Sequence, residues 1–285
     1  MLEMLINPAK AERRPWEMFF VGALYAGLSF ILVTWVFSKD AVLSEYSGIL
    51  VVLFTVLFSL PFVFYTLKLE EERISKNRGS WQLLKDHRNA IYAFLFLFLG
   101  FTVAFFVAYS LSSSTQGFEA QLKVYCQINR PSSFNECVQQ YGIKEAPTIV
   151  PFLSNKERLL LIFTNNMYVL LFTLIFSLLL GAGVIFILAW NATVIGAAMG
   201  IFTDYNLSGL FTGFVRFFLH GIFEIASYFI IALAGGMVSV AVVNHETGTS
   251  KFWDILQDSL NLIIISIVVL FVAALIEVFV TPILF

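Results

Sequence analysis

Charge is scarce in this sequence: only 13% of its 285 residues are Asp, Glu, Lys or Arg, and the formal net charge is −2. Soluble domains carry about 25% charged and about 45–50% apolar residues, whereas this chain is 59% hydrophobic and contains 32 Phe. A soluble fold could not cover so much apolar surface. The charge also leaves no basic face for binding DNA or RNA, so we expect no nucleic-acid partner.

Cysteines and the common catalytic motifs are also scarce. The chain has two cysteines, Cys126 and Cys137, too few and too far apart for a cysteine zinc site. No P-loop and no GxSxG motif occurs, which argues against nucleotide-driven and serine-hydrolase chemistry. We therefore expect a protein that is not an enzyme. Both cysteines fall in one polar loop, which predicts a Cys126–Cys137 disulfide; the alternative is two unrelated thiols.

Long apolar runs dominate what is present. A membrane-spanning helix needs about 20 apolar residues. Five runs have the length of one crossing: Met18–Phe37, Ile49–Leu67, Ile91–Leu111, Met167–Trp190 and Leu262–Val280. A sixth run, Phe214–Val243, is longer than one crossing requires, so we expect this helix to be tilted or to protrude.

A shorter apolar piece, Ala192–Phe202, cannot cross a bilayer at its length. We interpret it as a re-entrant or interfacial helix, which survives at depth only where protein or water satisfies its backbone. The predicted fold class is thus an all-α polytopic membrane protein. It has about six transmembrane helices, one short re-entrant or interfacial helix, and a small helical loop outside the membrane.

Basic residues near the span ends predict the orientation, because they favour the cytoplasmic side. They gather in the N-terminal segment and in the connector 68–90, so the loop 112–164 is expected outside. Both termini are then cytoplasmic, in the cell membrane. Lys156 and Arg158 oppose this orientation but are outnumbered. We divide the chain into an N-terminal three-helix region (1–111), the loop (112–164) and a C-terminal membrane region (165–285).

Helix signals occur in the predicted loop. Ser132 or Ser133 is placed to cap a helix that starts near Phe134. Ser154-Asn155-Lys156-Glu157 matches a capping box before a short amphipathic helix on the outer surface. We expect Asn165 and Asn166 to end that helix and open the fourth span.

A few polar residues inside the apolar runs stand out, since a charge near mid-membrane costs about 2.5–3.5 kcal/mol on insertion scales. Arg216, His220 and Glu224 recur every fourth residue, which places them on one helix face, extended by Ser227 and Tyr228. Glu277 lies in the last span. The short connection between these two spans makes them antiparallel, which brings Glu277 to the depth of Glu224. Asn191 is expected at the same depth.

Three interpretations of this polar cluster remain open. The residues could pair and lock two helices together. They could relay protons or hold a cation beside a broken helix, as in many transporters. His220, Glu224 and Glu277 could also bind a divalent metal, the cofactor such a set would take, although a zinc peptidase needs a second histidine on the same helix.

Two small-residue motifs, Gly196–Gly200 and Gly209–Gly213, have the GxxxG spacing that allows close helix approach. They indicate internal packing or, as the alternative, a seam for a homo-oligomer. The other partners to be expected are the lipid bilayer and further subunits of a membrane complex.

The C-terminal 120 residues resemble the stage II sporulation protein M family of membrane proteins. The resemblance rests on Asn165-Asn166, Gly181-x-Gly183, Asn191, His220-Gly221-Ile222-Phe223-Glu224, Gly235-Gly236 and the closing Ala274–Pro282. The N-terminal half, with Asn7-Pro8 and Arg14-Pro15-Trp16, is more loosely similar to archaeal members.

The bacterial namesake of the family works in a membrane complex with a cell-wall hydrolase. The resemblance therefore implies a permease-like or scaffold subunit of a membrane complex. The alternative is a self-contained transporter or cation-binding protein that uses His220, Glu224 and Glu277.

Overall fold

The computed structural model describes residues 8–37, 39–40, 42–72, 80–112, 117–129, 134–141, 154–180, 184–203, 207–244 and 247–284. Every regular element within these ranges is helical, and six helices are long and apolar enough to cross a membrane. A shorter apolar helix accompanies them. The predicted fold class is confirmed: this is an all-α polytopic membrane protein.

The helices in chain order run as follows. Their bounds are α1 Pro8–Arg13, α2 Glu17–Phe37, the 3₁₀ turn η2 Leu43–Tyr46, α3 Ser47–Glu72, α4 Ser80–Leu111, α5 Glu119–Asn129, α6 Phe134–Gln140, α7 Asn155–Leu180, α8 Val184–Thr203, α9 Leu207–Val243, α10 Ser250–Leu275, the π-helical turn η4 Ile276–Val280, and α11 Thr281–Leu284.

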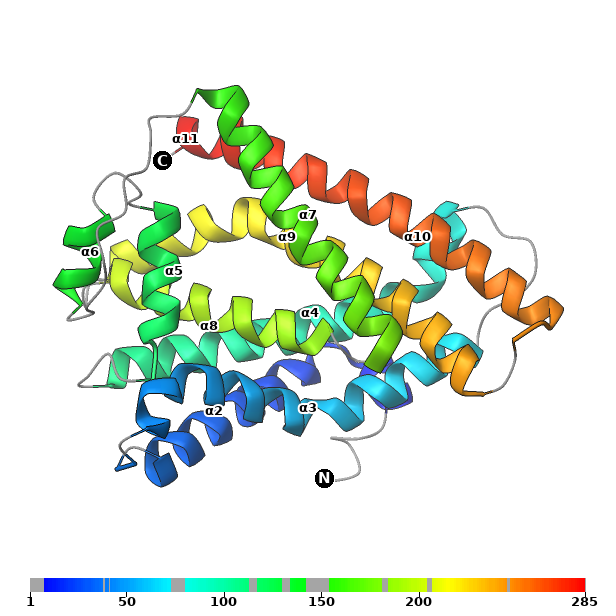
Figure 1. The fold of residues 1–285 in the computed structure, drawn as a ribbon, viewed down its shortest axis with the longest axis horizontal. Helices are drawn as coiled ribbons and strands as arrows, with labels where there is room; N and C mark the ends of the chain where they lie inside the picture. The colour runs from blue at the N-terminus through cyan, green and yellow to red at the C-terminus, as the bar shows by residue number, and fades with distance from the viewer. Residues whose placement is uncertain are drawn as a thin grey trace.

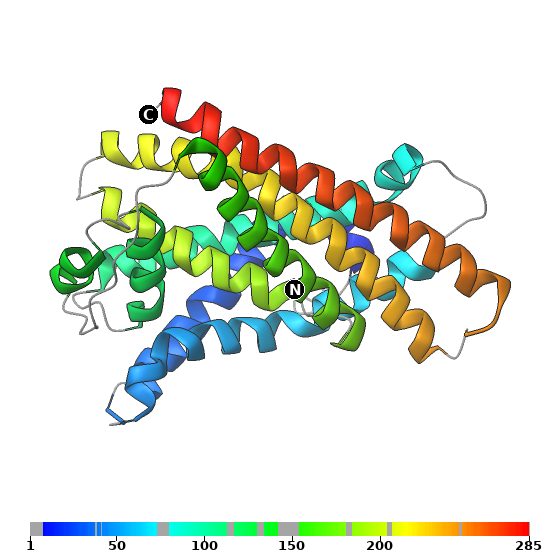
Figure 2. The ribbon, with the colours of Figure 1, turned by 45° about the horizontal axis from the view of Figure 1, so that its top comes forward.

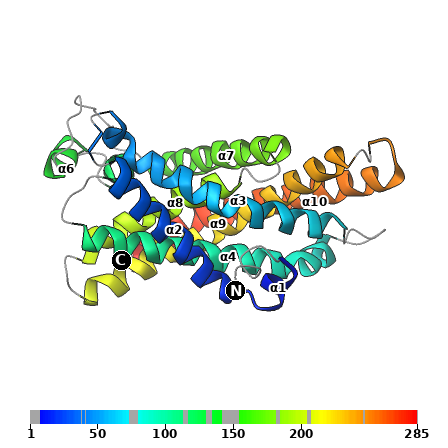
Figure 3. The same ribbon diagram turned by 90° about the horizontal axis from the view of Figure 1, so that it is seen from below.

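Most of the long helices lie along the length of the molecule, while α7 crosses over α8 and α9 obliquely (Figures 1 and 2). The short helices α5 and α6 sit together at one end (Figure 1). The end of α9 and the start of α10 lie at the opposite end (Figure 1). Seen from below, α2 crosses α4 on the side of the bundle away from α7 (Figure 3).

The prediction for the fourth span is wrong in its bounds. It was placed at Met167–Trp190, after a separate surface helix, but α7 runs without a break through Asn165 and Asn166 and ends at Leu180. The predicted capping box does start this helix: the backbone N–H of Ser154 donates to Glu157 Oε2 at 2.8 Å. Asparagines did not end the helix because Asn165 faces outward and Asn166 finds a partner inside the bundle.

The short apolar helix is also longer than predicted. Ala192–Phe202 forms only part of α8, which starts at Val184 and runs back through the bundle toward α5 (Figure 1). Ala192, Thr193 and Ala197 are fully buried. Thus α8 is an interior helix, and α3, α4 and α9 pack around it.

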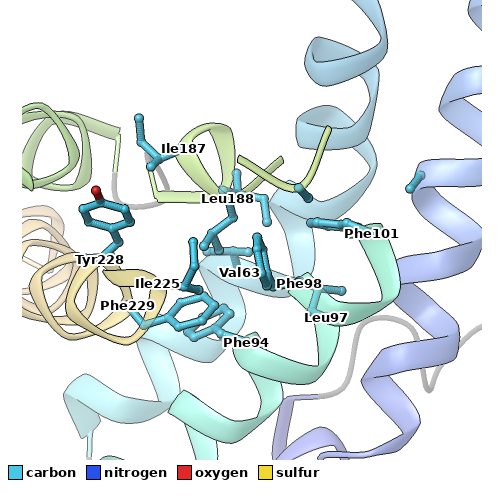
Figure 4. Close-up of a cluster of buried hydrophobic side chains, with 14 of the residues drawn as sticks. Val63, Phe94, Leu97, Phe98, Phe101, Ile187, Leu188, Ile225, Tyr228 and Phe229 are labelled. Atoms are coloured by element: carbon cyan, nitrogen blue, oxygen red, sulfur yellow. The ribbon is translucent and has the colours of Figure 1, made fainter. Parts of the chain in front are cut away.

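Phenylalanine side chains form much of the core between α3, α4, α8 and α9. Phe94 of α4 stacks on Phe229 of α9 with ring centroids 5.6 Å apart, and Val63 and Leu188 close the cluster (Figure 4). Such packing is the main source of helix association in lipid, where burial from water adds little.

Glycine sets the closest helix contacts. A Cβ added at Gly100 of α4 would lie 2.8 Å from the backbone nitrogen of Ala23, and closer still to the Phe19 carbonyl, so only glycine fits at this α2–α4 crossing. Gly196 and Gly200 of the first predicted small-residue motif pack in the same way against Phe105 and Tyr109 of α4. That face of α8 is therefore occupied inside the chain. The side chains around Gly209 and Gly213 lie outside the described residues.

The cap formed by α5 and α6 is tied to the bundle in two ways. Cys126 and Cys137 form the predicted disulfide, which joins α5 to α6. Gln121 of α5 is fully buried, and its Nε2 donates to the Gly48 carbonyl at 3.1 Å and to Thr193 Oγ1 at 3.2 Å. Helix α6 starts at Phe134 as predicted, and the serines expected to cap it lie outside the described residues.

Candidate functional site

The polar face predicted on the long sixth run belongs to α9, which is one continuous helix from Leu207 to Val243. Arg216 and His220 are part of this helix, but their side chains lie outside the described residues. Glu224 and Tyr228 follow on the same face one and two turns later, because residues four apart lie above one another on a helix. Both side chains are described.

Glu224 meets Glu277 across the α9–η4 interface. Their carboxyl groups are close enough to share a hydrogen bond, and both residues are half-buried. The structure thus brings together two of the residues singled out in the sequence, from helices that are neighbours and antiparallel. Two like charges cannot lie this close in a poorly polar environment unless a proton or another cation neutralises one of them.

Asn166 of α7 provides the third side of the site. Its Nδ2 donates a hydrogen bond of 2.6 Å to Glu224 Oε1. Besides this bond the amide keeps a second N–H donor and its Oδ1 acceptor. An asparagine near the middle of α7 therefore positions a carboxyl group that lies 58 positions further along the chain.

Tyr228 lies deeper than the two carboxyl groups. Only 2% of the residue is exposed, and the side chain lies within electrostatic range of both Glu224 and Glu277. Figure 4 shows its hydroxyl directed away from the ring of Phe229. Tyr228 thus lies on the same face of α9 as Glu224 and within the electrostatic influence of both carboxyl groups.

The helix that carries Glu277 is irregular at this position. Helix α10 passes at Ile276 into the π-helical turn η4, and the hydroxyl of Thr281 donates to the Ile276 carbonyl at 3.2 Å. Pro282 explains the change, because proline has no N–H for the carbonyl four residues earlier and its ring crowds that carbonyl. Single π-helical turns often occur at functional sites, and this one widens the helix beside Glu277.

Among the described side chains, one cation acts electrostatically on the carboxyl pair. Arg158, in the first turn of α7, is exposed and acts electrostatically on Glu277. In the sequence Arg158 stands out only as one of the basic residues near a span end, since nothing in its spacing links it to Glu277. Its place follows from the oblique course of α7, which also brings Phe163 to Phe271 with ring centroids 5.5 Å apart.

Two predicted residues stand apart from these contacts. Asn191 lies on α8, and its Nδ2 donates to the carbonyl of Ile187 on the same helix at 2.8 Å. Asn165 is exposed. Within the part of the chain that the structure describes, no group of three or more His, Cys, Asp or Glu side chains could hold a metal. His220, the nitrogen ligand predicted for such a site, is not among the described side chains.

The fold and this site define a class: an α-helical polytopic membrane protein with paired carboxyl groups between three helices of its C-terminal region. The family follows from sequence comparison. The family model described as SpoIIM, Stage II sporulation protein M, matches residues 93–282, and the chain belongs to this family. The match includes α7, α9 and η4, and hence every residue of the site. No curated protein and no solved structure matches the chain.

Proposed function

We propose that this protein is a permease-like component of a membrane complex, and that the Glu224–Glu277 pair is its working site. The observation that supports this proposal most directly is that two carboxyl groups meet inside the helix bundle, beside a π-helical turn. A pair that only locked helices together would be served better by apolar side chains, because desolvation of charged groups offsets their attraction. A site that takes up and releases a positive charge requires such a pair.

The side chains and helix geometry around the carboxyl pair are consistent with a site that binds and releases an ion. Asn166 holds Glu224 from a separate helix, while Glu277 sits on the irregular turn of η4. One carboxyl group is therefore fixed and the other is carried by a segment with weakened helical hydrogen bonding. Transporters commonly place their ion sites beside such interruptions.

The structure also bears on the proposed orientation in the cell membrane. The start of α7 and the end of α10 meet at the same end of the bundle, as the Phe163–Phe271 contact and the approach of Arg158 to Glu277 require. Because the cysteine-bearing loop leads into α7 there, residue 284 lies at the loop end. We propose that this end faces outward, as an alternative to the expectation of a cytoplasmic C-terminal end.

The test is ion flux through the protein with its native partners retained. The chain is purified under mild conditions from its own membrane and reconstituted into vesicles that contain a pH-sensitive dye, under an imposed membrane potential. Flux of protons or cations is expected in the wild type, with at least a tenfold loss in Glu224→Gln and in Glu277→Gln. Glu45→Gln, at an exposed position outside the site, is the matched control and should leave the flux unchanged.

Thermal unfolding of each variant is measured in parallel, and Tyr228→Phe serves as a second variant that keeps the packed ring. Wild-type flux no higher than that of empty vesicles would overturn the proposal. Full flux in folded Glu224→Gln and Glu277→Gln proteins would also overturn it, and would assign the pair to helix packing in a scaffold subunit.

A further inference from the structure

The outer face of α7 carries polar side chains at the depth where a membrane helix presents apolar ones to lipid. Of the six crossing helices that the structure describes, α7 is the least buried, and it lies obliquely across α8 and α9 (Figures 1 and 2). Thr164 and Asn165 are both exposed on it. Asn165 lies about 10 Å along the helix from Arg158. Because the charged first turn belongs at headgroup level, the Asn165 amide lies within the hydrocarbon region.

Two other crossing helices show what the lipid-facing surface of this chain normally contains. Every exposed residue of α2 between Phe20 and Val36 is apolar, and the same holds for α10 between Leu260 and Val272. Lipid offers no water to bond with an exposed amide, so an amide in hydrocarbon is unfavourable until another polar group meets it. The departure at Asn165 therefore indicates that a second membrane helix packs on this face of α7.

The face around Asn165 fits a second copy of the same helix. Leu161, Asn165, Tyr168 and Phe172 are exposed, carry no charge and follow each other at intervals of four, three and four residues. Helices that pack side by side use this spacing, and one Asn among apolar residues fixes their register. Two copies inserted in the same direction are related by a two-fold axis along the membrane normal, so a residue on the axis meets itself. An amide suits that position because it both donates and accepts.

We infer that the protein forms a two-fold symmetric dimer through α7, in which the Asn165 amides of the two copies hydrogen-bond to each other. The inference goes beyond the proposed function and does not depend on ion transport. The neighbouring Asn166 turns into the bundle and holds Glu224, so the dimer contact leaves the carboxyl site of each copy intact. The Gly196–Gly200 motif, considered from the sequence as a seam for a homo-oligomer, is used inside the chain.

Cross-linking in the native membrane tests which protein covers this face. Tyr168→Cys and Leu161→Cys each place a thiol about one turn from Asn165, while Cys126 and Cys137 are already joined. Mild oxidation should link two copies of either variant with at least fivefold higher yield than Leu28→Cys, at an exposed position on α2. Yields no higher than that of Leu28→Cys would overturn the inference. A cross-link to a different protein would also overturn it, because another subunit would then occupy the face.

The role of the amide is tested by energy transfer between full-length chains that carry donor or acceptor fluorescent proteins, diluted stepwise into lipid vesicles. Asn165→Leu should raise the dissociation constant of the dimer at least threefold, the effect of one hydrogen bond between membrane helices. Asn165→Gln, which keeps an amide, and Leu28→Ala, on α2, should stay within twofold of the wild type. Because Asn165→Leu removes a polar group from the lipid face, it should unfold at no lower temperature than the wild type.

Two results of the dilution experiment would overturn the inference. One is a wild type that shows no energy transfer at any ratio of protein to lipid. The other is an Asn165→Leu variant that associates as tightly as the wild type.

Discussion

The α2–α4 crossing and the Glu224–Glu277 site show two different ways of joining helices inside a membrane. At the crossing, Gly22 and Gly100 let two backbones touch. At the site, α7, α9 and η4 meet through hydrogen-bonding side chains. Close packing carries little desolvation penalty, whereas a carboxyl pair carries a large one. The first arrangement suffices for stability, which indicates that the second is kept for another purpose.

The largest effect is expected where the backbones touch. Gly100→Ala places a Cβ against the Phe19 carbonyl and the Ala23 nitrogen, neither of which can move without shifting a helix. We expect the free energy of unfolding to fall by about 3 kcal/mol, at the upper end of the range for overpacked cores. Thermal unfolding in detergent, followed by size-exclusion chromatography, measures it.

Gly27 provides the matched control on α2. A Cβ at this position meets nothing within 4 Å, so Gly27→Ala should stabilise the protein by up to about 1 kcal/mol through helix propensity alone. Equal effects of the two substitutions would show that backbone contact does not hold α2 against α4.

The next largest effect concerns the carboxyl pair. Replacing both groups, as in Glu224→Leu with Glu277→Leu, should raise the free energy of unfolding by about 1–4 kcal/mol. Well-packed apolar side chains often stabilise a protein more than a buried polar pair of similar volume does. The same protein should lose ion flux. The unfolding temperature and the vesicle assay are measured on one preparation. A double variant that is less stable than the wild type would show that the pair, like the glycine crossing, serves to hold helices together.

A smaller effect is expected at Ser177, where α7 approaches α9 near Gly235. The Ser177 hydroxyl is buried and has no hydrogen-bond partner among the described residues. Ser177→Ala removes that unsatisfied group and should gain up to about 1 kcal/mol. Thermal unfolding is the measurement, with Ser250→Ala, at an exposed position, as the control. A loss of stability would mean that the hydroxyl stabilises the α7–α9 contact rather than destabilising it.

The smallest effect lies in the turn after α2. The Asp40 carboxylate accepts hydrogen bonds from the backbone N–H groups of Leu43 and Val42, which lower its pKa below the ordinary value. Its contribution is therefore present above the unfolded-state pKa and is lost as the pH falls through the folded-state pKa. Asp40→Asn should flatten this acid limb of the unfolding temperature, while Glu45→Gln should not. An unchanged limb in Asp40→Asn would contradict the assignment.

The sequence predicted the structure best where the signal was local or where few arrangements of the residues were possible. Long apolar runs predicted six crossing helices, and the two cysteines allowed one disulfide. It failed at the fourth span because a polar Asn165-Asn166 pair suggests a break when the partner of Asn166 is unknown. That partner, Glu224, is set by the oblique course of α7, which no periodicity encodes. Arg158 was missed for the same reason, whereas Pro282 was a visible signal of the irregular turn.

The order in which the chain is made gives the hydrogen bond between Asn166 and Glu224 a second meaning. Synthesis proceeds at about 5–20 residues per second, so Glu224 is made several seconds before Glu277. Asn166, made earlier still as part of α7, is the partner that can shield the Glu224 carboxyl group from lipid before Glu277 arrives. The amide thus acts as a placeholder during biogenesis. Insertion of α9 should then depend on Asn166 even in chains that stop before Glu277.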